Sequence, residues 1–192
     1  MSVLETDGEA LLAAVRTLLV AKNVVTEIEI AERRQATDNA RPGQGARMVA
    51  RAWTDPEYRA MLLTDGSKGA EAMNIPMRGM PPLGVLENSH DVHHLIVCTL
   101  CSCYPRAVLG YPPYWYKSAA YRARAVRDPR GLLAEFGTIL PDSVKVRVVD
   151  STADFRWMVL PRRPAGTEGW GTERLAAIVR DGDMLGVSVP AV

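Results

Sequence analysis

Residues 97–105 read V-C-T-L-C-S-C-Y-P and hold all three cysteines of a chain of 192 residues. The spacing is C-x-x-C-x-C, and three hydrophobic residues, Leu95-Ile96-Val97, lead into it. A segment rich in proline and tyrosine follows, from Pro105 to Tyr116. We interpret the stretch as a metal-binding loop, and the rest of the functional interpretation depends on it.

The number and spacing of the thiols exclude several common roles. Cysteines this close bridge only with strain, and a third thiol would be left over. Structural zinc takes four ligands, usually in two separated pairs, and a [4Fe–4S] cluster needs a fourth cysteine that this chain lacks. The main chain can complete the site instead, because the peptide nitrogens of Ser102 and Cys103 lie between two sulfurs. With the sulfurs of Cys98, Cys101 and Cys103, these nitrogens form a five-donor claw with one octahedral position open. Thiolates and deprotonated amides favour trivalent cobalt or iron over magnesium, calcium or manganese.

Several motifs together resemble the α-subunit of nitrile hydratases and the equivalent γ-subunit of thiocyanate hydrolase. Besides the claw, the match includes G-A-R-M-V-A-R-A-W-T-D-P-E-Y at 45–58, V-L-G-x-P-P-x-W-Y-K-S-A-A-Y-R at 108–122 and V-L-P-R-R-P-A-G-T-E-G-W at 159–170. The resemblance implies a non-corrin Co(III), or less favourably Fe(III), held by Cys98, Cys101, Ser102 and Cys103. Thr99 resembles the cobalt type, since iron-type members have serine there. The resemblance further implies a thiolate at Cys98, a sulfinate at Cys101 and a sulfenate at Cys103. It also implies a four-layer α-β-β-α arrangement and a β-type partner subunit.

Length and composition are typical of one soluble globular domain. We place the metal-binding catalytic domain at residues 41–192, behind an N-terminal helical arm at 1–40. The chain is 47% hydrophobic with a net charge of +1, which gives no electrostatic case for nucleic acid or membrane as a partner. We see no membrane span and no signal peptide at the N-terminus. Clustered free cysteines indicate a reducing compartment, and we expect the cytoplasm.

Hydrophobic periodicity and turn residues divide the chain into expected elements and favour an α+β fold. A helix is expected over residues 7–36, with Asp7 as N-cap and a break near Asn23, followed by a loop over 36–45. Asp55-Pro56 is typical of a helix start and divides residues 47–64 into two helices. The other expected elements are a loop over 73–84, a strand over 92–97, helices over 113–127 and 132–136 (closed by Gly137), strands over 144–149 and 155–160 around residues 150–152, a helix over 172–180 capped by Thr172, and a strand over 184–189.

The neighbourhood of the claw supplies candidates for the substrate pocket. Trp115 follows the claw closely, and Asp154 and Arg156 match an acid-x-Arg pattern of the family, although a surface ion pair explains these two equally well. His93 and His94 lie on opposite faces of their strand, and we expect both to be surface or hydrogen-bonded core histidines. Arg106 stands where nitrile hydratases for small nitriles commonly have tryptophan.

The resemblance implies an enzyme that hydrates a nitrile to the amide, with Cys101 and Cys103 as catalytic residues and the metal as Lewis acid. Arg106 favours a polar or anionic substrate. We therefore expect either a bulky nucleoside nitrile, such as toyocamycin giving sangivamycin, or thiocyanate as in thiocyanate hydrolase. A different class of protein, for metal storage or thiol-based redox sensing, also uses clustered cysteines.

Overall fold

The computed structural model describes residues 3–192, and their contacts divide the chain into two compact units, Met1–Asn39 and Ala40–Val192. The first unit consists of α1 (Val3–Ala21) and α2 (Glu27–Asn39). They are separated near Asn23, which adopts a positive φ of 55°, so the predicted break is confirmed. Thr26 and Glu29 form a reciprocal capping box at the start of α2. The predicted N-cap Asp7 is wrong, because α1 begins four residues earlier.

The second unit begins with three helices, α3 (Pro42–Thr54), α4 (Pro56–Thr64) and α5 (Gly66–Glu71). The carboxylates of Asp55 and Asp65 cap the last two, accepting hydrogen bonds from the main-chain N–H groups of Tyr58 at 2.9 Å and Lys68 at 3.0 Å. The predicted start at Asp55-Pro56 is therefore confirmed. The loop expected over 36–45 is wrong, since only residues 40 and 41 lie outside helices there, and α5 was not predicted.

The strands form two parallel pairs. β1 (Leu83–Glu87) pairs with β4 (Arg156–Leu160), and β2 (Val92–Val97) pairs with β3 (Lys145–Asp150). The strand predicted over 92–97 is confirmed. The two later strands exist as predicted but do not pair with each other across residues 150–152. Each joins an earlier strand instead, because the apolar strands β1 and β2 are buried between the helices and need partners for their main-chain groups.

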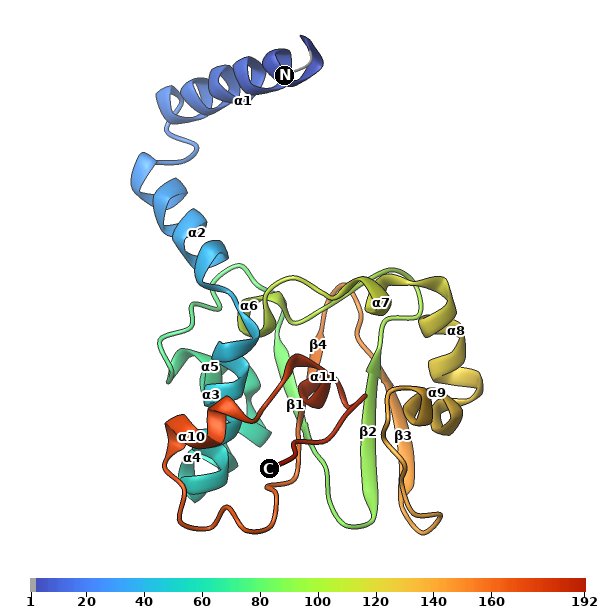
Figure 1. Ribbon diagram of the computed structural model, residues 1–192. Coiled ribbons are helices and arrows are strands. Elements are labelled where there is room, and N and C mark those ends of the chain that lie inside the picture. Colours follow the sequence, from blue (N-terminus) through green and yellow to red (C-terminus); the bar gives the residue numbers. More distant parts are fainter. Residues whose placement is uncertain (1–2) are drawn as a thin grey trace. The chain divides into compact units, whose positions relative to one another are not determined.

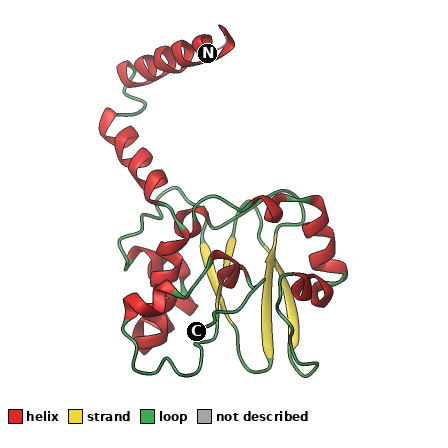
Figure 2. Ribbon diagram, viewed as in Figure 1, coloured by secondary structure: helices red, strands yellow, loops and turns green. Residues whose placement is uncertain are grey.

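The remaining helices are α6 (Arg106–Leu109), α7 (Tyr114–Lys117), α8 (Ala119–Arg127), α9 (Pro129–Glu135), α10 (Thr172–Ala177) and α11 (Asp181–Leu185). Helix α8 packs on β2, α9 on β3, and α11 on β2 and β4, whereas α6 and α10 pack on α3. In the second unit, helices α3, α4, α5 and α10, the sheet β1–β4, the sheet β2–β3, and helices α8 and α9 follow one another across the view in Figure 1. Figure 2 shows the same order by the type of element. The α+β fold with four layers is therefore confirmed.

Four other predictions need correction. The single helix expected over 113–127 is interrupted at Ser118, whose hydroxyl caps α8 by accepting from the N–H of Tyr121. The loop expected over 73–84 ends at β1, which begins at Leu83. The strand expected over 184–189 is wrong, since α11 ends there. Thr172 is not a cap, because Gly171 occupies the N-cap position. In the described part of the chain, no helix is long and apolar enough to cross a membrane.

The end of α11 shows why residues 184–189 do not form the expected strand. Gly186 has a positive φ of 80°, and a side chain there would begin 1.9 Å from the carbonyl oxygen of His94. This close approach packs α11 against β2 and β4, where it closes the core between the sheets.

Candidate metal centre

The three thiols converge on the loop that follows β2. The Sγ atoms of Cys98 and Cys101 lie 3.5 Å apart, and those of Cys101 and Cys103 lie 3.2 Å apart. All three sulfurs lie within 4.8 Å of one another. A disulfide would bring two of them to about 2 Å, so these are separate thiols facing a common point. Cys98 and Cys103 are buried, whereas Cys101 is exposed.

The parallel pairing of β2 and β3 fixes where this loop begins. Val97 pairs in register with Asp150, the last residue of β3. The Asp150 carboxylate therefore lies beside the loop that follows β2. There it accepts hydrogen bonds from the N–H (3.0 Å) and the hydroxyl of Thr99. Within the loop, the N–H of Cys101 donates to the sulfur of Cys98 at 3.3 Å.

Three side chains from the segment α7–α8 donate to carbonyl groups around the claw. The Tyr121 hydroxyl donates to Ile96 before the claw at 2.6 Å, and the Tyr116 hydroxyl donates to Cys103 at its end at 2.8 Å. Between them, Nη1 of Arg122 donates to Leu100 at 2.9 Å. Burial raises the pKa of both tyrosines well above the usual range, so their hydroxyls remain donors at neutral pH.

The protonation of the thiols is set by their contacts with one another. Hydrogen bonds from Cys103, Cys98 and the main chain lower the pKa of Cys101 to about 7. Burial, followed by the hydrogen bonds of the two other thiols, raises the pKa of Cys103 to about 12, and the nearby charge of Arg156 opposes that shift. Cys101 therefore becomes a thiolate at lower pH than Cys103. Deprotonation of Cys103 needs a cation in the site, as metal binding provides.

The donor set fits a transition metal. Sulfurs about 2.3 Å from one ion, at right angles to each other, lie roughly 3.3 Å apart. The observed separations of 3.2 and 3.5 Å match that distance. Soft sulfur donors with main-chain nitrogens between them suit cobalt or iron and do not suit the hard cations that prefer oxygen.

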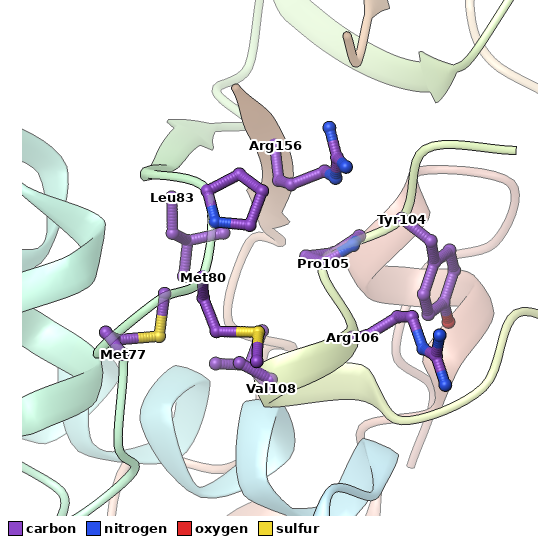
Figure 3. A pocket seen from close by; sticks show the side chains of 10 residues that line it. Met77, Met80, Leu83, Tyr104, Pro105, Arg106, Val108 and Arg156 are labelled. Atoms are coloured by element: carbon purple, nitrogen blue, oxygen red, sulfur yellow. The ribbon is translucent and has the colours of Figure 1, made fainter. Parts of the chain in front are cut away.

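A cleft adjoins the claw on the side where Tyr104 and Pro105 leave it. Its lining residues are Met77, Met80, Pro81, Leu83, Tyr104, Pro105, Arg106, Ala107, Val108 and Arg156. Figure 3 shows Met77 and Met80 on one side of the cleft and Arg156 and Arg106 on others. The mostly apolar cleft thus has two arginine residues in its lining.

Two of the predicted pocket residues line the cleft, and Trp115 does not. Arg106 and Arg156 both line the cleft. Arg106 stacks 4.4 Å above the ring of Tyr111. Nη1 of Arg156 is buried and has no hydrogen-bond partner among the described residues. Trp115 packs edge-on against Tyr121 and Phe136 instead, outside the set of residues that lines the cleft.

Asp154 is exposed, and in the described part of the chain no ion pair joins it to Arg156. The alternative of an ion pair between these two side chains is therefore wrong. Arg156 lines the cleft, and Asp154 is not among the residues that line it.

The two histidines of β2 are hydrogen-bonded core residues, as predicted. The His93 ring lies 2.7 Å from the carbonyl oxygen of Gly186 and 3.1 Å from the amide nitrogen of Asn88. The N–H of His94 donates to the side-chain oxygen of Asn88 at 2.8 Å.

Sequence reasoning did not find Asp150, Tyr116, Tyr121 or Arg122. A signal for Asp150 exists in hindsight, because it directly follows the strand predicted over 144–149, and Val97 ends the strand predicted over 92–97. Parallel pairing of those strands would have placed its carboxylate beside Thr99.

Residues 6–188 match the family model described as nitrile hydratase, alpha chain. The chain belongs to this family. The predicted family and the prediction of an enzyme subunit are therefore confirmed.

Relatives in the nitrile hydratase alpha-chain family differ in metal and reaction. The chain is 48% identical over 92% of its length to the alpha subunit of a low-molecular-weight cobalt-containing nitrile hydratase from Rhodococcus rhodochrous, covering 86% of that protein. It is 42% identical over 96% of its length to the gamma subunit of thiocyanate hydrolase from Thiobacillus thioparus, covering 80% of that protein. A solved double mutant of the iron-type nitrile hydratase from Comamonas testosteroni is 38% identical, with a TM-score of 0.78 over 96% of this chain and 91% of that one. The cysteine cluster thus marks a metal-binding family that includes both metals.

Proposed function

We propose that this chain is the metal-binding catalytic subunit of a cobalt nitrile hydratase, which converts a nitrile to the amide together with a β-type subunit. The convergence of three sulfurs beside a cleft is the observation that carries the proposal. The Sγ separations of 3.2 and 3.5 Å leave room for one ion between the thiols. The thiolates of Cys98, Cys101 and Cys103 and the main-chain nitrogens of Ser102 and Cys103 would hold it.

When bound, the trivalent ion supplies Lewis acidity that draws electron density from the nitrile carbon. The chain's own residues position the substrate and its water. The apolar cleft excludes bulk water, and Arg156 offers a buried Nη1 donor that has no partner among the described residues. We propose that this donor binds an oxygen or nitrogen that develops negative charge next to Cys103. Oxidation of Cys101 to a sulfinate, by four electrons, and of Cys103 to a sulfenate, by two, belongs to the same proposal, with dioxygen or a peroxide from solution as the oxidant and source of the added oxygen atoms.

Cobalt is the proposed metal. Threonine at position 99, directly after the first cysteine, resembles the cobalt type. The Rhodococcus rhodochrous relative is also named cobalt-containing. Metal analysis with intact mass spectrometry of the purified complex tests this directly. The proposal is supported by one cobalt per chain, two added oxygen atoms on one cysteine and one added oxygen atom on another. Tetrahedral zinc would end it. We further propose the cytoplasm as the location, because the thiols must stay reduced until the metal arrives.

Arg106 supports a substrate with a polar or anionic group. Arg106 lines the cleft and lies three residues after the last cysteine. We propose a nucleoside nitrile such as toyocamycin, whose base and sugar would extend beyond the small apolar cleft. Thiocyanate is the second candidate, because it is an anion that Arg106 can attract and because a relative 42% identical is a thiocyanate hydrolase subunit.

One assay ranks these substrates. The chain, coexpressed with its β-type partner and cobalt, is given toyocamycin, thiocyanate and a small aliphatic nitrile in parallel. Turnover of toyocamycin alone supports the nucleoside nitrile, and its absence ends that choice. Turnover of thiocyanate alone assigns the second function. A complex that turns over none of them, lacks a charge-transfer band and shows reversible thiol oxidation is a redox sensor or storage protein.

A further inference from the structure

The guanidinium of Arg122 spans from α8 to the loop between the first two cysteines. Its Nη1 donates to the carbonyl oxygen of Leu100 at 2.9 Å and lies 3.4 Å from that of Thr99. Both carbonyls belong to exposed residues, and the Leu100 side chain is 87% exposed. Arg122 is therefore the group through which α8 holds this otherwise open turn.

The same turn is held from its other side by Asp150. The carboxylate accepts from the N–H and the hydroxyl of Thr99, while the arginine donates to the carbonyls. An anion thus binds the N–H of Thr99, and a cation binds the carbonyl groups of Thr99 and Leu100. Together they hold the main chain between Cys98 and Cys101.

Charge gives Arg122 a second effect at the claw. Five anionic donors around a trivalent ion leave a net negative charge, and an arginine is cationic at any pH that the fold survives. Nε of Arg122 is buried and has no hydrogen-bond partner among the described residues, so part of its donor capacity is unused. Within the claw's surroundings, Arg156 acts on Cys103, and Arg122 acts on the turn before Cys101.

A neighbour on the same helix shows that this contact is not an ordinary surface pair. Arg124 lies two residues further along α8 and forms ion pairs with Asp128 and Glu135. Arg122 has no carboxylate within salt-bridge distance among the described residues, although it is partly buried. Its acceptors are the main-chain oxygens of the claw loop.

We propose that Arg122 is a positioning residue of the metal centre, which orients the turn between Cys98 and Cys101 and offsets the negative charge of the claw. The proposal rests on the proposed metal-binding function. A residue in this role affects how tightly the metal is held and the energies of its electronic transitions. It does not touch the substrate.

The test compares Arg122→Gln and Arg122→Lys with the matched control Arg124→Gln, each in the cobalt-loaded complex with the β-type subunit. Cobalt per chain under limiting cobalt, the position of the charge-transfer band, and kcat and KM are measured. Loss of a group that supports metal ligands lowers metal affinity or activity roughly 10- to 100-fold. We expect such a loss in cobalt content and kcat for Arg122→Gln, with a shifted band and an unchanged KM. Arg122→Lys should recover part of the loss, because it keeps the charge and can reach one carbonyl. Arg124→Gln should match the wild type.

An Arg122→Gln complex with wild-type cobalt content, band position and kcat would overturn the proposal, as would a lysine variant no better than glutamine. If the glutamine variant does not assemble, the lysine variant decides, and a wild-type band with wild-type kcat in it would overturn the proposal. Failure of the function itself looks different, since the wild-type complex would then lack cobalt and turnover.

Discussion

Asp150 accepts two hydrogen bonds from Thr99, one from the main-chain N–H at 3.0 Å and one from the hydroxyl. Thr99 follows the first cysteine of the claw, and Asp150 ends β3 opposite Val97. The register of a parallel strand pair therefore sets the first turn of the metal loop. A slip of one residue would turn the Asp150 side chain to the other face of the sheet.

Thr99→Val should weaken the fold slightly, because valine keeps the shape and the N–H bond but loses the hydroxyl donor. A loss of about 1 kcal/mol in the free energy of unfolding is expected. Asp150→Ala removes the acceptor for both hydrogen bonds. It should therefore lower the free energy of unfolding by more than Thr99→Val does, and it should also lower the cobalt content. Thermal unfolding and metal analysis of the complex measure both effects. Asp142→Ala, at an exposed position before β3, is the control. Wild-type cobalt content in Asp150→Ala would contradict the role of this carboxylate.

Ser102→Ala should keep the metal and most of the activity, since the claw uses the main-chain nitrogen of residue 102 and not its hydroxyl. Cys101→Ala and Cys103→Ala should each abolish turnover, because each removes a sulfur from the set that lies within 4.8 Å. Turnover and cobalt per chain are measured in all three complexes. Near-normal turnover in either cysteine variant would refute the claw, and loss of cobalt in Ser102→Ala would show that the hydroxyl is a ligand.

Tyr116→Phe should destabilise the fold by about 1–3 kcal/mol, the cost of a buried carbonyl left without its donor. The Tyr116 hydroxyl donates to Cys103 at 2.8 Å, and the side chain is fully buried. Tyr114→Phe, at a side chain that is 90% exposed, is the matched control and should change stability by less than about 0.5 kcal/mol. Denaturant unfolding compares the two, and equal midpoints would show that the Cys103 carbonyl finds another donor.

The metal-free chain should be alkylated first at Cys101. Its pKa is lowered from 9.0 to about 7, so near neutral pH about half of it is the nucleophilic thiolate, and its rate falls as the pH drops below about 7. Burial raises the pKa of Cys103 to about 12, so that thiol stays protonated and reacts more slowly than Cys101. Timed iodoacetamide labelling with peptide mass spectrometry gives the order. Faster labelling of Cys103 than of Cys101 would be inconsistent with this geometry.

Stability should decline as the pH falls below about 6.5, because burial lowers the pKa of both His93 and His94 from their ordinary value of 6.5. In that range the unfolded chain binds more protons than the folded chain, so protons favour unfolding. His93→Gln should flatten the dependence of the melting temperature on pH between about 7 and 5. A slope that survives in the His93 variant would place its origin elsewhere.

Much of the candidate site could be predicted from the sequence because its geometry is local. Three thiols within six residues can meet without help from distant chain, and Asp55-Pro56 caps a helix through contacts three residues away. The strand at residues 92–97 was predicted for the same reason, since its apolar run shows in the sequence itself. β1 was missed because Pro81, Pro82 and Gly84 are typical of a loop. Its strand conformation depends on pairing with β4, more than 70 residues later.

The sequence by itself determined that three thiols lie close together, because the spacing of cysteines in one short loop limits how far apart they can be. Only the tertiary structure decided what surrounds them. Asp150 lies 51 residues from Thr99, and Arg122 lies 22 residues from Leu100. Their contacts arise from the register of β2 with β3 and from the placement of α8 against β2. Such long-range pairings depend on packing between layers, which no local pattern of residues encodes.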